Sequence, residues 1–378
     1  MDPLNLEDDV DAVAISFKSL ACARAYKLAD YYRSKNVKVI LGGVHTTLVP
    51  EEASQHADSI VIGECEEVLP QLVDDLKNGD LKKAYKAGSL ADLSQIPLPK
   101  FEIINHKKYL CHSIQTSRGC SLDCEFCPTR QVFGGTFRVK PIKNVIAEIK
   151  KVLEIEKKFI FFTDDIFGAG KKDYILELLP QLKKLKIDYM LISDYQVLDK
   201  EIVLALARNR CRKLCINMLG TCLKEEVKAI RAIQSLGIDV WGYFGFGFKF
   251  QTKDVFRRVL DFIEESRLTH ASFAIMAPYP NTPMAQRLEK DKRIFSKDWT
   301  LYDQSHVVFK PDLMDVEDLQ KGFEWVWGEK KGMTKIPSYY FKQKGGFAIA
   351  IRMFFVSIAI RIEKLLGFIG IKTKKRSK

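Results

Sequence analysis

Three cysteines within eight residues are the strongest chemical feature of this chain. Cys120, Cys124 and Cys127 lie in the segment CSLDCEFC, on a loop that follows an expected strand. Thiolates this close together can converge on one metal centre. A [4Fe-4S] cluster normally takes four cysteines, so three from one loop would leave one iron open to a substrate or cofactor. The spacing therefore favours an iron–sulfur cluster with a reactive iron.

Two other interpretations of the cysteines stay open from spacing alone. A structural zinc site needs four ligands and could recruit Cys111, His112 or His106 as the fourth. Zinc sites usually combine two separate CxxC pairs, however, and this chain has only one. Buried thiols without any ligand are the third interpretation, which the polar neighbours Asp123 and Glu125 disfavour. The order of preference is therefore cluster, zinc, inert thiols.

The elements around these cysteines alternate between short apolar runs and helical patterns. This alternation is typical of a parallel sheet covered by helices. The runs predict strands near residues 112–117, 159–164, 187–193, 213–219, 239–247 and 270–277. Six β/α units predict a partial, TIM-like (β/α)6 barrel, with the active site at the carboxyl ends of its strands.

A shorter α/β series precedes this barrel. The apolar runs DAVAISF, VKVILGG and SIVIG alternate with helical patterns and predict an incomplete Rossmann-like (flavodoxin-like) parallel domain with three strands. Residues 80–106 are less periodic and contain the prolines of IPLP, so we expect the domain linker there. We divide the chain into a partial α/β domain (1–100), the barrel (101–295), an extension (296–341) and an apolar, basic tail (342–378).

Composition excludes several broad classes. The 378 residues are 47% hydrophobic and 29% charged, which is typical of globular domains and not of disordered or collagen-like chains. Nine cysteines without an N-terminal apolar signal region indicate a reducing compartment, so we expect a cytoplasmic protein. The net charge is +12, but from residue 342 onward ten basic residues face one glutamate. Because the body of the chain is nearly neutral, we expect no nucleic-acid partner.

The motifs together resemble those of the radical S-adenosylmethionine (radical SAM) superfamily. The resemblance is carried by RGCSLDCEFC, FFTDDIF, GYFGFGF and MAPYPNTPMAQRL, which occur in the family's order. The upstream stretch LGGVHTTLVPEEASQHADSIVIGECEE resembles the cobalamin (B12)-binding domain that precedes the barrel in one branch of that superfamily. Relative to that domain the chain starts near the third β/α unit and therefore looks N-terminally truncated.

This resemblance implies a function. The three cysteines would hold a [4Fe-4S] cluster whose fourth iron is chelated by SAM, and reductive cleavage of SAM would give a 5′-deoxyadenosyl radical for C–H activation. Cobalamin would add methyl transfer or cyclisation, and ferredoxin or flavodoxin would donate the electron. Two alternatives remain: a cobalamin-independent radical SAM enzyme with a remnant N-terminal domain, and a zinc-stabilised binding protein without catalysis.

The resemblance also implies cofactor contacts beyond the cysteines. They are Phe126, Asp164, Asp165, Thr221, Gly245, Gly247, Tyr279 and His45. The two aspartates would meet the SAM amine, and the glycines would leave room for adenine or ribose. Helix capping, a strand bulge, packing and a satisfied local turn are the corresponding structural alternatives. Two family features are missing: a carboxylate at the end of the fourth strand, where Thr221 offers only a hydroxyl, and an Asp-x-His-x-x-Gly segment.

The last expectation concerns the segment from Gly345 to Ile371. It is strongly apolar but interrupted by charges, so its uncharged stretches are shorter than the roughly 20 residues of a spanning helix. Beside the basic run KTKKRSK it resembles an interfacial helix, which predicts contact with the inner membrane face and a lipid-like or other small-molecule substrate. A terminal helix docked on the barrel is the alternative.

Overall fold

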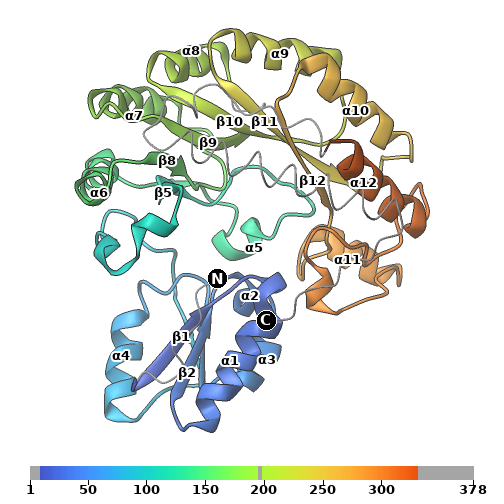
Figure 1. Ribbon diagram of the computed structural model, residues 1–378. Coiled ribbons are helices and arrows are strands. Elements are labelled where there is room, and N and C mark those ends of the chain that lie inside the picture. The colour runs from blue at the N-terminus through green and yellow to red at the C-terminus, as the bar shows by residue number, and fades with distance from the viewer. Residues whose placement is uncertain (1–8, 195–197, 331–378) are drawn as a thin grey trace, which may run out of the picture.

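The structure, a computed structural model, describes residues 9–194 and 198–330. Figure 1 shows a smaller α/β unit at the N-terminal end and a larger curved sheet above it, with one short helix between them. The tail beyond residue 330, for which we predict membrane contact, lies outside the described residues. Within the described ranges, no helix is long and apolar enough to cross a membrane.

The N-terminal sheet has four parallel strands in chain order. They are β1 (Ala12–Ser16), β2 (Lys38–Gly42), β3 (Ser59–Ile62) and β4 (Ala84–Lys86). Its helices are α1 (Cys22–Ser34), α2 (Val44–Leu48), α3 (Pro50–Ala53) and α4 (Leu69–Asn78). Separate apolar clusters cover the two faces, one centred on α1 and α3 and the other on α4.

The fourth strand corrects the prediction of three. It lies within the stretch expected to be a linker, and only its central residue, Tyr85, is buried. A three-residue strand shows too little alternation for a period of two to be recognised. The Tyr85 hydroxyl also donates to Asp75 of α4 at 2.7 Å, which helps to fix the strand against that helix.

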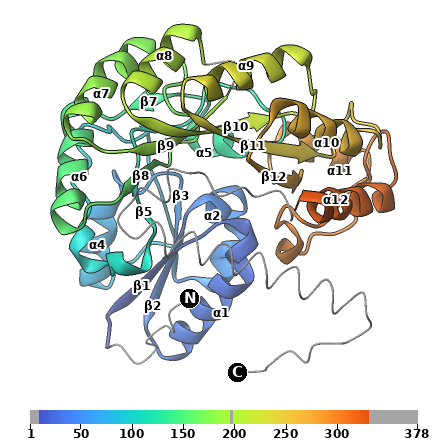
Figure 2. The same cartoon turned by 45° about the horizontal axis from the view of Figure 1, so that its top comes forward.

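The larger sheet confirms the predicted parallel α/β half-barrel. Six parallel strands follow one another in chain order. They are β5 (Cys111–Ile114), β8 (Phe159–Phe162), β9 (Tyr189–Asp194), β10 (Cys211–Met218), β11 (Asp239–Phe246) and β12 (His270–Ile275). The helices of its convex face are α6 (Ile142–Ile155), α7 (Lys172–Lys184), α8 (Lys200–Arg208), α9 (Lys224–Ser235) and α10 (Val255–Ser266). Figure 2 shows the same arrangement from a tilted view.

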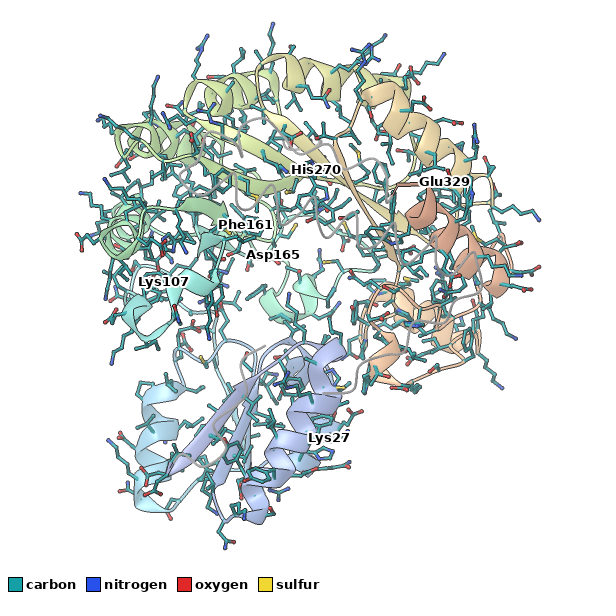
Figure 3. All side chains as sticks on the ribbon, viewed as in Figure 1. Lys27, Lys107, Phe161, Asp165, His270 and Glu329 are labelled. Atoms are coloured by element: carbon teal, nitrogen blue, oxygen red, sulfur yellow. The ribbon has the colours of Figure 1, made fainter. Side chains whose placement is uncertain are left out.

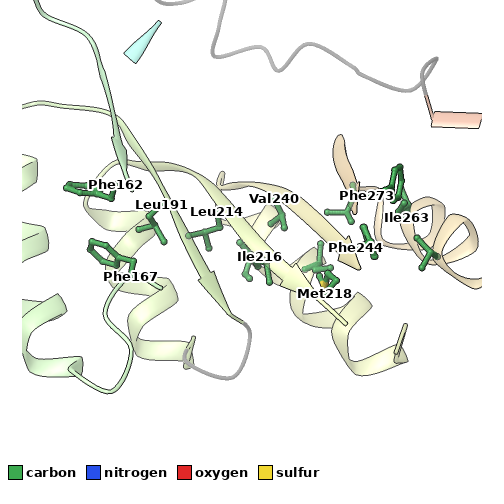
Figure 4. Packing of buried hydrophobic residues seen from close by; sticks show 14 of the residues in the cluster. Phe162, Phe167, Leu191, Leu214, Ile216, Met218, Val240, Phe244, Ile263 and Phe273 are labelled. Carbon is green, nitrogen blue, oxygen red and sulfur yellow. The ribbon is translucent and has the colours of Figure 1, made fainter. Parts of the chain in front are cut away.

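The main core lies between this sheet and its outer helices. Alternate strand residues such as Leu214, Ile216 and Phe244 are buried there, and Figure 4 shows them in one continuous layer with Phe162 and Phe273. Because side chains alternate across a strand, the remaining strand residues point to the concave side. The concave side is therefore where side chains remain available for chemistry.

Shorter elements complete the fold. An antiparallel hairpin of β6 (Ser117–Arg118) and β7 (Arg138–Val139) encloses the cysteine loop and α5 (Thr129–Phe133). The C-terminal region adds α11 (Pro283–Lys290) and α12 (Val316–Lys330). Single 3-10 turns occur at Ser19–Ala21, Ser54–His56, Phe101–Ile103, His106–Lys108 and Trp299–Leu301.

Candidate active site

The three cysteines line one cavity of about 220 Å³. The cavity lies at the carboxyl ends of β8, β9 and β10, with the cysteine loop and α5 as its other wall. Its lining residues are Cys120, Leu122, Cys124, Phe126, Cys127, Thr129, Arg130, Asp165, Ile166, Asp194, Asn217 and Leu219. This is the edge of a parallel barrel at which active sites occur.

The thiols of this cavity suit a positive centre. Burial raises the pKa of the Cys120 thiol, and it raises that of Cys124 to about 11, with a further contribution from the neighbouring thiols. Three thiolates facing one cavity repel one another unless cations lie between them, and bound iron deprotonates the thiols it coordinates. The donor set therefore fits an iron–sulfur cluster.

None of the three residues expected as a fourth zinc ligand lines the cysteine cavity. Cys111 and His112 begin β5 at the opposite edge of the sheet, and the His112 ring donates to the Glu156 carbonyl at 2.7 Å. The His106 ring donates to the Phe101 carbonyl at 2.6 Å.

The two neighbouring aspartates have different roles. Asp164 is buried and accepts hydrogen bonds from the backbone and side chains of Thr116 and Ser117, including one of 2.6 Å from the Ser117 hydroxyl. It therefore fixes the strand end that leads into the cysteine loop and does not line the cavity. Asp165 does line the cavity, where it accepts from the Gly119 N–H at 3.2 Å. Figure 3 places it on the concave side.

Two further polar residues line the cavity but were not predicted as site residues from the sequence. Asp194 ends β9 and Asn217 lies near the end of β10, and the two are direct neighbours in the sheet register. A carboxylate and an amide side by side can accept from the ammonium and ribose hydroxyls of SAM. A sequence signal was present, because each residue is a polar side chain at or next to the carboxyl end of a predicted strand. A contact between Asp194 and SAM is a prediction.

Phe126 lies where the resemblance implies, whereas the two glycines are explained by packing. Phe126 lines the cavity and its ring packs edge-on against Phe248, with 5.3 Å between the centroids. A Cβ on Gly245 would come within 2.9 Å of that Phe248 ring, and one on Gly247 within 3.0 Å of Phe309. Neighbouring side chains therefore require glycine at both positions, and a contact of either with adenine or ribose stays a prediction.

Thr221 and Tyr279 also serve the fold. The Thr221 hydroxyl donates to Glu226 at 3.1 Å, and Glu226 accepts from the Leu223 N–H, so this group organises the start of α9. The Tyr279 hydroxyl donates to the Tyr302 carbonyl at 3.2 Å. Neither residue lines the cysteine cavity, so a cofactor contact for either stays a prediction.

The structure contradicts a direct cofactor contact for His45. The side chain has no exposed surface, and its ring nitrogens lie 2.9 Å from the Ser19 hydroxyl and 3.1 Å from that of Tyr26. Its ring also packs against Trp299, which donates to Glu52 at 2.9 Å. His45 thus joins the N-terminal unit to the C-terminal extension, a role that only the tertiary fold reveals.

This burial predicts a pH dependence of stability. Burial lowers the pKa of His45, and the nearby Glu52 only partly opposes it. An unfolded histidine takes up a proton below about pH 6.5, whereas the folded one stays neutral. The free energy of unfolding should therefore fall as pH drops below that value. Urea unfolding at pH 7.5 and at pH 5.5 gives the difference in free energy of unfolding between the two pH values. This difference should become smaller in His45→Gln. It should stay the same in the control His306→Gln, which changes an exposed histidine. If the difference is unchanged in His45→Gln, the buried His45 does not cause the pH dependence.

Comparison with known proteins agrees with this site. The family model of the radical SAM superfamily matches residues 114–263, from β5 into α10. Bacteriochlorophyllide d C-12(1)-methyltransferase of Chlorobaculum tepidum is 31% identical over 83% of this chain and 73% of its own. Hopanoid C-2 methylase of Rhodopseudomonas palustris is 25% identical over 76% of this chain and 59% of its own.

A solved structure has the same fold. The radical SAM methyltransferase TsrM from Kitasatospora setae, with tryptophan and a SAM analogue bound, superposes with a TM-score of 0.62 at 16% identity. The superposition covers 75% of this chain and 66% of that one. The cysteine cavity, the half-barrel and the 31% sequence identity with the Chlorobaculum enzyme lead to one conclusion. The chain belongs to the radical SAM superfamily, as an enzyme that uses a [4Fe-4S] cluster and S-adenosylmethionine.

Proposed function

We propose that this enzyme is a cobalamin-dependent methyltransferase that modifies a carbon atom of an apolar polycyclic substrate. Two similar relatives are methyltransferases of bacteriochlorophyllide d, and a third is a hopanoid methylase. Both substrate types are large, rigid and mostly apolar. A reduced ferredoxin or flavodoxin would supply the electron.

The observation that carries this proposal is a second cavity, of about 320 Å³, on the other side of α5. Loops at the carboxyl edge of the N-terminal sheet form one wall of this cavity, which is the edge where α/β domains bind ligands. The other wall is α5 itself, through Gln131 and Val132, whereas Thr129 and Arg130 of the same helix line the cysteine cavity. One helix of five residues therefore separates the two proposed cofactor sites.

The lining of this second cavity suits the edge of a corrin. Gly63 and Gly88 have no side chain, so their backbone can approach a ligand. The Gly63 N–H donates to the Thr47 hydroxyl at 2.9 Å. No histidine is among the described residues that line it. When bound, cobalamin would carry the methyl group and SAM would supply the radical. The chain would orient both cofactors and exclude water from the two cavities beside α5.

Filling the second cavity tests the proposal. A Cβ on Gly88 meets no atom within 4 Å, so Gly88→Trp can fold while its indole occupies the cavity. We expect the wild-type enzyme to bind hydroxocobalamin in equilibrium dialysis and Gly88→Trp to bind it at least about tenfold more weakly, a loss of about 1.4 kcal/mol.

Lys77→Trp, on the exposed side of α4, is the matched control and should bind like the wild type. A wild-type protein that holds its cluster and cleaves SAM but binds no hydroxocobalamin would instead be a cobalamin-independent enzyme. Transfer of label from methyl-labelled SAM into an apolar extract, present in wild type and reduced in Gly88→Trp, is the second measurement.

A further inference from the structure

The concave face of the half-barrel continues the cysteine cavity across three strands. Asp194 and Asn217 are register neighbours on β9 and β10, and both line the cavity. Asn217 pairs in turn with Tyr243 of β11, and Tyr243 pairs with Ser272 of β12. Since neighbouring strands lie about 4.8 Å apart, Tyr243 is only one strand from the edge of the cavity.

Tyr243 forms a fixed aromatic stack with Trp241, two residues earlier on the same strand. Their ring centroids are 5.5 Å apart and their planes differ by 12°. The Trp241 indole N–H donates to the Ser272 hydroxyl at 3.0 Å, which fixes its orientation, and the Lys213 ammonium lies 5.2 Å from the indole centroid. Because the rings cover each other, they present mainly their edges to the concavity.

The concave surface around this stack is mixed and incompletely covered. The polar residues His270 and Ser272 pair with it on β12, whereas the apolar side chains lie on β8 and β9, the strands that lead to the cysteine cavity. Trp241 and Tyr243 are only half-buried, as are Phe161, Met190 and Ile192 at concave positions of β8 and β9. Among the described elements, the helices between the strands pack on the convex face, opposite to these side chains (Figure 1). Half-buried apolar and aromatic side chains beside a catalytic cavity are suited to the body of an apolar substrate.

We propose that Trp241 and Tyr243 are specificity-determining residues for a flat aromatic macrocycle. This inference rests on the proposed function and narrows its substrate class. The edge of an aromatic ring is electropositive and prefers the face of another π system, so ring edges favour an aromatic plane over a saturated polycycle. A macrocycle lying against the stack extends to Asn217 and so brings its periphery to the cavity where SAM binds.

Binding of protoporphyrin IX to the cluster-loaded, full-length enzyme under anaerobic conditions tests this inference. The shift of the porphyrin's main absorption band reports binding without relying on activity. Trp241→Leu keeps apolar bulk but removes the ring, and we expect it to bind about 2- to 12-fold more weakly. Trp241→Phe keeps an aromatic edge and should bind within about twofold of the wild type.

Trp325→Ala is the matched control, because Trp325 is an exposed tryptophan (41%) on α12, and its affinity should equal that of the wild type. Cholate serves as the saturated polycycle. Equal porphyrin affinity in wild type and Trp241→Leu, or competition by cholate as strong as by porphyrin, would overturn the inference. So would absence of porphyrin binding. Iron content and 5′-deoxyadenosine formation in the same samples report separately on the proposed function.

Discussion

Replacing Cys124 by alanine should abolish both the iron–sulfur cluster and the formation of 5′-deoxyadenosine from SAM. The cavity offers three thiols, each of which would hold one iron of the cluster. Two remaining thiolates would leave a further iron without a protein ligand, and the cluster would be lost. Cys120→Ala and Cys127→Ala should behave in the same way, because all three side chains line that cavity. Iron and sulfide per protein, followed by product formation with a strong reductant, measure the loss, which should exceed about a thousandfold.

Cys65→Ala is the matched control for this prediction. Cys65 is exposed and lies outside the cysteine cavity, so its removal should leave iron content and SAM cleavage unchanged. Undiminished 5′-deoxyadenosine from Cys124→Ala would contradict the assignment of the cluster. A protein that binds one zinc ion and no sulfide would revive the zinc interpretation.

Local patterns were sufficient to predict the half-barrel. Each of its strands is a run with apolar residues on the convex side, and the outer helices have clear apolar stripes, so both periodicities are visible in sequence. The cysteine motif was equally local, because its three ligands come from one loop. What these features share is that the chemistry or burial of one segment can be recognised without knowing its neighbours.

Features that depend on distant neighbours could not be predicted in the same way. His45 was expected either to contact a cofactor or to be satisfied by a local turn, but its burial is completed by Trp299, which is far away in the sequence. Gly245 looked like a backbone surface for a ligand, whereas Met276 and Phe248 fill the space beside it. In each case the sequence showed an unusual residue at a strand end, and only the packed structure shows which group occupies the adjacent space.

A buried ion cluster joins the N-terminal unit to the hairpin that encloses the cysteine loop. Glu64, just after β3, is 7% exposed and lies 2.8 Å from the Arg118 guanidinium and 3.0 Å from that of Arg138. Those arginines belong to β6 and β7, the hairpin that encloses the cysteine loop. Burial alone would raise the pKa of Glu64, but hydrogen bonds from Arg138 and Arg118 lower it, so the carboxylate is ionised and shared.

Glu64→Ala should therefore be the most destabilising change near the site. It leaves the partly buried Arg138 guanidinium without its carboxylate, and Arg118 with Glu66 alone, and breaking a buried ion pair typically costs about 3–5 kcal/mol. Glu66 offers a control within the same cluster: it contacts Arg118 at 2.7 Å, but its side chain is 27% exposed, so Glu66→Ala should cost about 1 kcal/mol or less.

Urea unfolding of both variants gives their free energies of unfolding, and iron retention after gel filtration reports whether the cysteine loop has moved. If the hairpin is fixed mainly by its own strand pairing, Glu64→Ala will match Glu66→Ala in both measurements. A large loss confined to Glu64→Ala would instead show that the N-terminal unit holds the cluster loop in place, so that cofactor binding in one unit affects the geometry of the other.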